Sequence, residues 1–190
     1  ITRLGDDDFA AMARGIWAKA GVTPDVTVDR ESYTGAAMIF LEAGTGNNAI
    51  IVAPGAASRI TVEDVESRAA LIQGAGIFIT QLEQPIPAAQ RALEIARAAG
   101  VTTILNPAPA ASLPDAMLAL CDYLTPNESE AEALTGLPVT SIDEAKTAAA
   151  ELLAKGVGAV VITLGGQGAL YHDAKTTIHV PVVSAGKVVD

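Results

Sequence analysis

Between residues 60 and 165 the sequence alternates short apolar runs with longer helix-like stretches. The apolar runs are too short for helices and are bounded by glycine, proline or polar residues, which is typical of buried strands. The predicted strands are residues 76–82, 101–105, 123–124 and 159–164, and the predicted helices are 61–72, 86–99, 113–120, 128–134 and 142–154. Parallel strands need helical crossovers, so this alternation predicts a doubly wound α/β domain: a mostly parallel sheet with helices on both faces. Residues 169–183 are predicted as antiparallel strands at the edge of this sheet.

The composition excludes several classes of function. Half of the 190 residues are hydrophobic and the net charge is −10, without any run of basic residues. A nucleic-acid partner is excluded because it requires clustered Lys and Arg. We see no apolar run long enough for a membrane span and no signal peptide, so we expect the cytoplasm and a small-molecule substrate. Cys121 is alone, which excludes an intrachain disulfide and a cysteine metal cluster.

A β-hairpin is predicted at about residues 33–54, before the alternating region. Its two strands are joined by Gly44 to Asn48, whose residue types favour tight turns. The first strand is apolar on both faces, so we expect a covering element on each. The chain begins at Ile1 and ends at Asp190 without a closing element, and we therefore expect residues 1–190 to form one incomplete domain.

Polar residues follow the predicted strands, where ligands bind in open α/β sheets. Glu83 follows the first strand, and it can either lie near the positive end of the next helix or accept hydrogen bonds from sugar hydroxyls. A proline-rich segment, residues 106–110, follows the second strand and is interpreted as a stiff turn or as part of a site.

Two further motifs follow the third and fourth strands. Asn127 and Glu130 have the spacing of a capping box, and the same helix start could bind a phosphate and a hydrated Mg²⁺. Residues 163–168 (Thr-Leu-Gly-Gly-Gln-Gly) form either a hairpin turn or a loop that a nucleotide can approach closely. This loop is not a P-loop, and it lacks the glycine spacing of a dinucleotide-binding oxidoreductase.

Taken together, these motifs resemble the ribokinase family of carbohydrate kinases over essentially the whole chain. The matching segments are residues 5–9 (Gly-Asp-Asp-Asp-Phe), 81–83 (Gln-Leu-Glu), 105–110 (Leu-Asn-Pro-Ala-Pro-Ala), 125–131 (Thr-Pro-Asn-Glu-Ser-Glu-Ala), 134–136 (Leu-Thr-Gly) and 163–165 (Thr-Leu-Gly). The resemblance implies transfer of the ATP γ-phosphate to the 5-hydroxyl of D-ribose, with Mg²⁺ and K⁺. It also implies that the hairpin is a lid over the sugar and packs on the lid of a second copy in a homodimer.

The resemblance also implies roles for individual residues. Glu83 would bind the sugar, and Ala37, Ile39 and Val52 would press onto it from the lid. Asn127 and Glu130 would serve the phosphate and its Mg²⁺, and Asp190 would help to bind the monovalent cation. The ATP would be lined by the glycine-rich loop, namely Thr163, Leu164, Gly165, Gly166, Gln167 and Gly168.

The sequence departs from the family pattern in three places. The family's glycine-rich sugar segment would precede Ile1, and its catalytic base and oxyanion hole would follow Asp190, so we expect no catalytic residue in this chain and no kinase activity from it alone. Ala57 replaces a family asparagine. Two alternatives stay open: a sibling kinase that acts on fructose, another ketose or a nucleoside, and a sugar- or nucleotide-binding module without catalysis.

Overall fold

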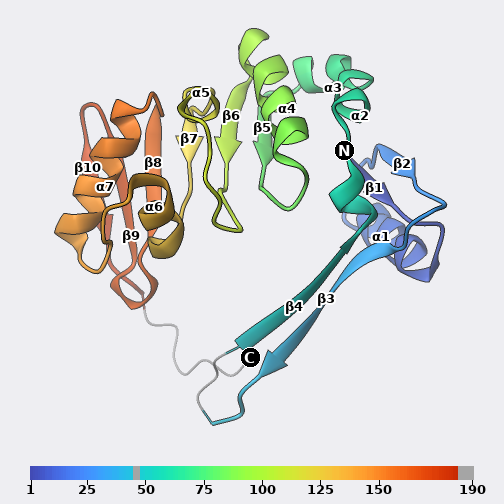
Figure 1. Ribbon diagram of the computed structural model, residues 1–190, viewed down its shortest axis with the longest axis horizontal. Helices are drawn as coiled ribbons and strands as arrows, with labels where there is room; N and C mark the ends of the chain where they lie inside the picture. Colours follow the sequence, from blue (N-terminus) through green and yellow to red (C-terminus); the bar gives the residue numbers. More distant parts are fainter. Residues whose placement is uncertain (45–47, 184–190) are drawn as a thin grey trace. The chain divides into compact units, whose positions relative to one another are not determined.

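The computed structural model describes residues 1–44 and 48–183, which divide into two compact units (Figure 1). The first unit comprises residues 1–64 and 83–85 among those described, and the second comprises residues 65–82 and the described residues from 86 onward. The turn at residues 45–47 and the predicted cation ligand Asp190 lie outside the described residues. No helix in the described part of the chain is long and apolar enough to cross a membrane.

The second unit is built on a six-stranded sheet with the strand order β10-β9-β8-β7-β6-β5 (Figure 1). Its strands are β5 (Ile77–Thr80), β6 (Thr102–Leu105), β7 (Tyr123–Leu124), β8 (Ala159–Thr163), β9 (Ala169–Asp173) and β10 (Thr177–Val180). β5 to β8 pair in parallel, and β8, β9 and β10 pair antiparallel. The predicted mostly parallel sheet with an antiparallel edge is confirmed.

Helices make the crossovers between the parallel strands. They are α4 (Ile86–Ala98), α5 (Asp115–Leu118), α6 (Glu128–Thr135) and α7 (Ile142–Ala154). α4, α6 and α7 bury Leu93, Ala131 and Leu152 in one hydrophobic core with Leu124 and Ile162 of the sheet. The predicted helix at residues 61–72 is instead two short helices, α2 (Val62–Glu66) and α3 (Ala69–Gln73), because Arg68 leaves the helical backbone conformation (φ −112°, ψ 14°).

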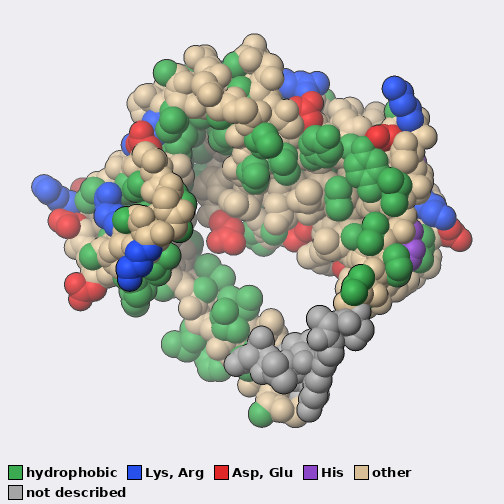
Figure 2. Space-filling view, turned by 180° about the vertical axis from the view of Figure 1, so that it is seen from behind, with side chains coloured by type: hydrophobic (Ala, Val, Ile, Leu, Met, Phe, Trp, Pro, Cys, Tyr) green, Lys and Arg blue, Asp and Glu red, His purple; other side chains and the backbone are tan. Residues whose placement is uncertain are grey.

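The core helices cover one face of the six-stranded sheet. Alternate strand residues point to opposite faces, and the face away from the core carries Ile77, Ile79, Tyr123 and Ile178, which are 56%, 59%, 39% and 49% exposed. Figure 2 shows hydrophobic side chains gathered on this side.

The first unit carries the hairpin, which forms a two-stranded sheet of its own. β3 (Thr34–Leu41) pairs antiparallel with β4 (Asn48–Gly55), so the prediction that this segment is not a strand of the main sheet is confirmed. The rest of the unit contains a parallel pair, β1 (Thr2–Leu4) and β2 (Val26–Val28), with α1 (Asp8–Lys19) and the short helix η1 (Ala56–Arg59). α1 begins after Asp7, whose side chain caps it by accepting the N–H of Ala10.

Candidate functional site

The polar motifs lie together at the carboxyl edge of the parallel strands. Three backbone hydrogen bonds join successive strand ends there, each beyond the last residue pair that the two parallel strands share. They run from the Asn106 N–H to the Thr80 carbonyl (3.0 Å), from Thr125 to Leu105 (2.9 Å) and from Thr163 to Pro126 (3.0 Å). The segments that follow β6, β7 and β8 therefore form one continuous edge.

The start of α6 is a complete capping box. The Asn127 side chain accepts the Glu130 N–H at 2.9 Å, and the Glu130 carboxylate accepts the Asn127 N–H at 2.8 Å. Glu130 is 6% exposed, so its charge is held in place by the helix start itself. The box occupies two of the four amides that a helix start leaves unpaired. The remaining two, those of Glu128 and Ser129, donate to no other residue in the described ranges.

The glycine-rich loop that joins β8 to β9 lies against this helix start. Thr163 forms an isolated parallel bridge with Asn127, and the Leu164 N–H closes the loop onto the Gly168 carbonyl at 2.8 Å. Gly168 has a φ of +95°, and a Cβ added there would lie 2.0 Å from the Val180 carbonyl oxygen. This glycine is required by packing against β10. The turn and nucleotide interpretations of the loop are compatible, because it joins two antiparallel strands and also borders α6.

The loop is also held by two contacts that sequence reasoning did not identify. The Gln167 side chain donates to the Thr140 carbonyl at 3.2 Å, and the Gln167 carbonyl accepts from His179 Nε2 at 2.7 Å. Thr140 is itself fixed by Glu144, whose pKa is lowered by hydrogen bonds from the Thr140 hydroxyl (2.6 Å) and N–H (2.8 Å). The paired residues are 27 and 12 positions apart, so no local sequence signal reveals them. The side chain, the N–H and the carbonyl of Gln167 are therefore all engaged in holding the loop.

The predicted lid residues share one face of the hairpin. Ala37 lies opposite Val52, and Ile39, two residues further along β3, lies opposite Ile50. All four side chains are exposed. The other face carries Met38, Phe40 and Ile51, which are also more than half exposed. Both faces of the hairpin are therefore apolar and exposed over its described residues, and Figure 2 shows hydrophobic side chains on the side of the hairpin seen in that view.

Glu83 has an exposed side chain and follows β5 in a loop. Together with Gln84 and Pro85 it belongs to the first unit, which also contains the hairpin, whereas Asn127, Glu130 and the glycine-rich loop belong to the second. No group of three His, Cys, Asp or Glu side chains is placed to hold a metal within the described ranges. The predicted Mg²⁺ ligands in the described residues thus comprise one carboxylate, Glu130, and one side-chain amide, Asn127. Both already take part in the capping box.

Comparison with known proteins gives a consistent result. Residues 1–190 match the family model described as pfkB family carbohydrate kinase. The chain is 41% identical over 181 residues to the ribokinase of Staphylococcus aureus (strain COL), a match that covers 95% of the chain and 59% of the relative. It is 33% identical over 190 residues to the deoxyribokinase of Salmonella typhi, with 99% and 62% covered.

A solved structure of Arabidopsis thaliana ribokinase complexed with ribose and ATP superposes with a TM-score of 0.84 at 28% identity, covering 100% of this chain and 62% of that one. The chain therefore spans about three fifths of the length of these relatives.

Proposed function

Because the chain belongs to the pfkB family of carbohydrate kinases, we propose that the protein containing it is an ATP-dependent kinase that phosphorylates the 5-hydroxyl of D-ribose. One observation carries the proposal: the glycine-rich loop is joined to the capped start of α6 by the Thr163–Pro126 hydrogen bond. Phosphoryl transfer depends mainly on positioning and on stabilising charge, and a helix start beside a glycine loop provides both for a nucleotide.

The ATP phosphates are assigned to the start of α6. The amides of Glu128 and Ser129 are the two that the capping box leaves available, and they lie at the positive end of the helix dipole. The glycine-rich loop, Thr163 to Gly168, would line the nucleotide. Gly166 supports this because a Cβ there would meet nothing within 4 Å, so the loop leaves open space on that side.

A magnesium ion fits this helix start if phosphate and water supply most of its ligands. Mg²⁺ keeps several waters and needs few carboxylates, in agreement with the small donor set of Asn127 and Glu130. The Glu130 Oε1 atom takes no part in the capping box and is the available oxygen. When bound, the ion would offset the phosphate charge close to the Glu128 carboxylate, which lies near the glycine-rich loop. A K⁺ ion bound with help from Asp190 remains a prediction.

The sugar is assigned to Glu83 and to the hairpin face formed by Ala37, Ile39 and Val52. A carboxylate is suited to accept hydrogen bonds from sugar hydroxyls, and an apolar lid would exclude water from the reacting groups. We assign no catalytic base to this chain. We propose that the catalytic base and the oxyanion donors lie in a part of the protein that corresponds to the relatives' residues outside this match.

A homodimer through the hairpin is part of the same proposal. The observation that favours it is the second apolar face, which carries Met38, Phe40 and Ile51 and which a lid over a sugar would leave uncovered. A contiguous exposed apolar surface of this kind is typical of an interaction site.

The second candidate function is a kinase for a related sugar, and the 33% identity to a deoxyribokinase favours this class. The test is an ADP-release assay on the complete polypeptide encoded by the gene, with ATP and Mg²⁺, with and without K⁺. D-ribose, 2-deoxyribose, fructose and a nucleoside would be compared by kcat/KM. We expect ribose to be preferred. A preference for another of these substrates would establish the sibling kinase, and binding of ATP without turnover of any of them would refute a kinase.

A further inference from the structure

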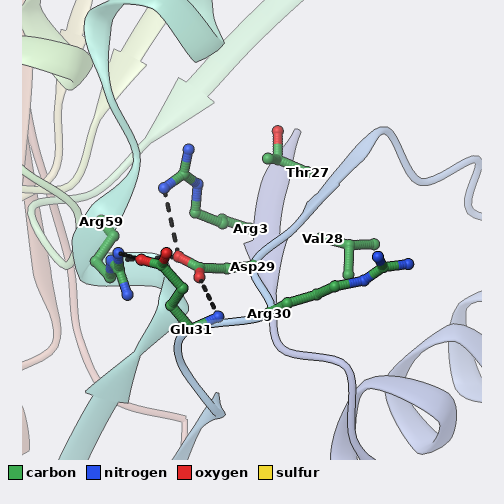
Figure 3. Close-up of a pocket in the computed structure, with 7 residues that line it drawn as sticks. All are labelled: Arg3, Thr27, Val28, Asp29, Arg30, Glu31 and Arg59. Atoms are coloured by element: carbon green, nitrogen blue, oxygen red, sulfur yellow. Dashed lines mark hydrogen bonds and ion pairs between the residues drawn. The ribbon is translucent and has the colours of Figure 1, made fainter.

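A cavity of about 510 Å³ in the first unit contains a set of ion pairs that the proposed site does not use (Figure 3). Its lining residues are Arg3, Thr27, Val28, Asp29, Arg30, Glu31 and Arg59. The three arginines do not form an anion site because each is already paired with a carboxylate in this unit. Arg3 pairs with Asp29 and Asp64, Arg59 with Asp29 and Glu31, and Arg30 with Asp6.

At the centre of this network is the carboxylate of Asp29, whose side chain is 6% exposed. Arg3 in β1 approaches it at 3.4 Å and Arg59 in η1 at 3.2 Å, so two guanidinium groups share one buried carboxylate. The Glu31 N–H also donates to it at 3.0 Å, and the Glu31 side chain accepts from Arg59 at 3.0 Å. We call Arg3, Asp29, Glu31 and Arg59 the base clamp, after their place at the base of the hairpin.

The base clamp joins the two ends of the hairpin. Asp29 and Glu31 lie on the segment that enters β3, and Arg59 lies on the segment that leaves β4. The two segments also meet through the backbone, where the Ala56 N–H donates to the Tyr33 carbonyl at 2.8 Å. Gly55 has a φ of +53°, and a Cβ there would lie 2.4 Å from the Tyr33 carbonyl oxygen, so the two segments are in close contact.

Beyond this base, the hairpin has no support from the described residues of its own unit except the pairing of its two strands. The side chains of β3 from Ala36 to Leu41 are all exposed, as are those of β4 from Asn48 to Val52. An isolated two-stranded hairpin is only marginally stable in water. Its direction is therefore determined by the contacts at its base.

We propose that the base clamp positions the hairpin, with Arg59 and Asp29 as positioning residues for the sugar-binding face. This inference rests on the proposed function, in which Ala37, Ile39 and Val52 contact the sugar. A small displacement at the base is magnified along the eight residues of each strand, and small misplacements of a binding group are costly to substrate use. The clamp acts through the hairpin and touches no reacting atom.

The first test is kinetic and uses the complete gene product. Arg59→Ala removes the two ion pairs that join η1 to Asp29 and Glu31. We expect the KM for the sugar to rise about tenfold while the KM for ATP stays within about twofold. Arg59→Lys should recover part of the loss, because an ammonium keeps the positive charge but lacks the planar fork that holds two carboxylates in a fixed geometry. Arg30→Ala is the matched control: Arg30 lines the same cavity, but its side chain is 84% exposed and, among the described residues, forms an ion pair with Asp6 alone. It should leave both KM values unchanged.

The second test is hydrogen exchange, which needs no kinase activity. In Arg59→Ala the amides of β3, β4 and Ala56 should exchange about tenfold faster than in the wild type, while those of α7 should not change. If Arg59→Ala does not fold, Glu31→Ala takes its place, because it removes only the exposed half of the clamp. It should raise the sugar KM and speed amide exchange in the hairpin, each by less than Arg59→Ala.

Faster exchange in the hairpin together with a raised sugar KM supports the proposal. An unchanged sugar KM, or equal effects on the sugar and ATP KM values, overturns it, and so does unchanged exchange in the hairpin. A wild-type protein without sugar kinase activity refutes the proposed function and, with it, the role of the clamp in substrate binding.

Discussion

Cys121, the only cysteine of the sequence, is 1% exposed, and burial raises the pKa of its thiol to about 12. The Asp122 carboxylate adds to this shift, and the Arg97 guanidinium opposes it. Because the thiolate is the reactive form, we predict that the native protein does not react with a disulfide-exchange reagent at about pH 8, below the shifted pKa. The unfolded protein should react completely. Absorbance of the released thiol measures this, with Cys121→Ser as the blank, and rapid labelling of native protein would contradict the assigned burial.

Asp7 connects the start of α1 to the base of the hairpin. Its pKa is lowered, first by the Thr34 N–H, which donates to it at 2.7 Å, and also by the Ala10 N–H. Because its folded-state pKa is lowered, the Asp7 carboxylate stabilises the fold at pH values above its unfolded-state pKa, near 3.8. This contribution is lost as the pH falls through the lower folded-state pKa. We predict that Asp7→Asn is less stable than wild type at neutral pH and that the difference shrinks below pH 3.8.

Urea unfolding of both proteins across this pH range measures the difference for Asp7. Asp8→Asn, at the exposed neighbouring position, is the control and should show no such convergence. A constant gap between Asp7→Asn and wild type at all pH values would mean that the loss comes from the changed side chain and not from its charge.

At the scale of elements, the capping box of α6 combines a structural and a binding role that substitutions can separate. Asn127→Ala removes the cap and should lower the free energy of unfolding by about 1 kcal/mol. Asn127→Asp keeps a capping oxygen and should retain stability, but its added charge should weaken nucleotide binding at the same helix start. Urea unfolding and calorimetric titration with an ATP analogue measure the two effects. Equal nucleotide affinity in wild type and Asn127→Asp would place the phosphates elsewhere.

Elements whose signals are local could be predicted from the sequence. The capping box follows from the spacing of Asn127 and Glu130, and the hairpin from its turn residues and flanking apolar runs. β4 ends at Gly55, just beyond the predicted hairpin at about residues 33–54, because Thr34 of β3 pairs with Gly55, a contact that the apolar pattern does not include. The break between α2 and α3 was missed because the pattern there remains compatible with one helix.

Contacts between distant parts of the chain could not be predicted. Arg3 and Asp29 are 26 residues apart, and Arg59 and Glu31 are 28 apart, so the base clamp has no spacing that distinguishes it from other surface charges. The His179–Gln167 contact was missed for the same reason, because it depends on the antiparallel pairing of β9 with β10.

At the scale of the whole molecule, the order of alternating elements predicted the parallel sheet but not the environment of its two faces. Ile77 and Ile79 continue an apolar strand and were expected to be covered on both sides, yet they are 56% and 59% exposed. An apolar residue indicates that a face can be buried, but it does not indicate which element covers it. The motif order did predict that the segments after β6, β7 and β8 meet at one edge, since parallel strands end on the same side.

The division into two units leads to a prediction about ligand selectivity. Glu83 belongs to the first unit, with the hairpin, whereas the capping box and the glycine-rich loop belong to the second. Glu83→Ala in the complete gene product should therefore weaken sugar binding and leave ATP binding nearly unchanged. Loss of a charge-assisted hydrogen bond costs about 1.5 to 3 kcal/mol, or about ten- to a hundredfold in affinity.

Calorimetric titration of this variant with ribose and, separately, with an ATP analogue measures both affinities. Glu132→Ala, at another exposed glutamate in α6, is the control and should leave the ribose affinity unchanged. Because Glu83 has an exposed side chain, its replacement should not lower the free energy of unfolding, so a weaker sugar affinity cannot be attributed to misfolding. If the ATP affinity fell while the ribose affinity held, the sugar and nucleotide assignments would be reversed, and the hairpin would have to be reconsidered as a nucleotide lid.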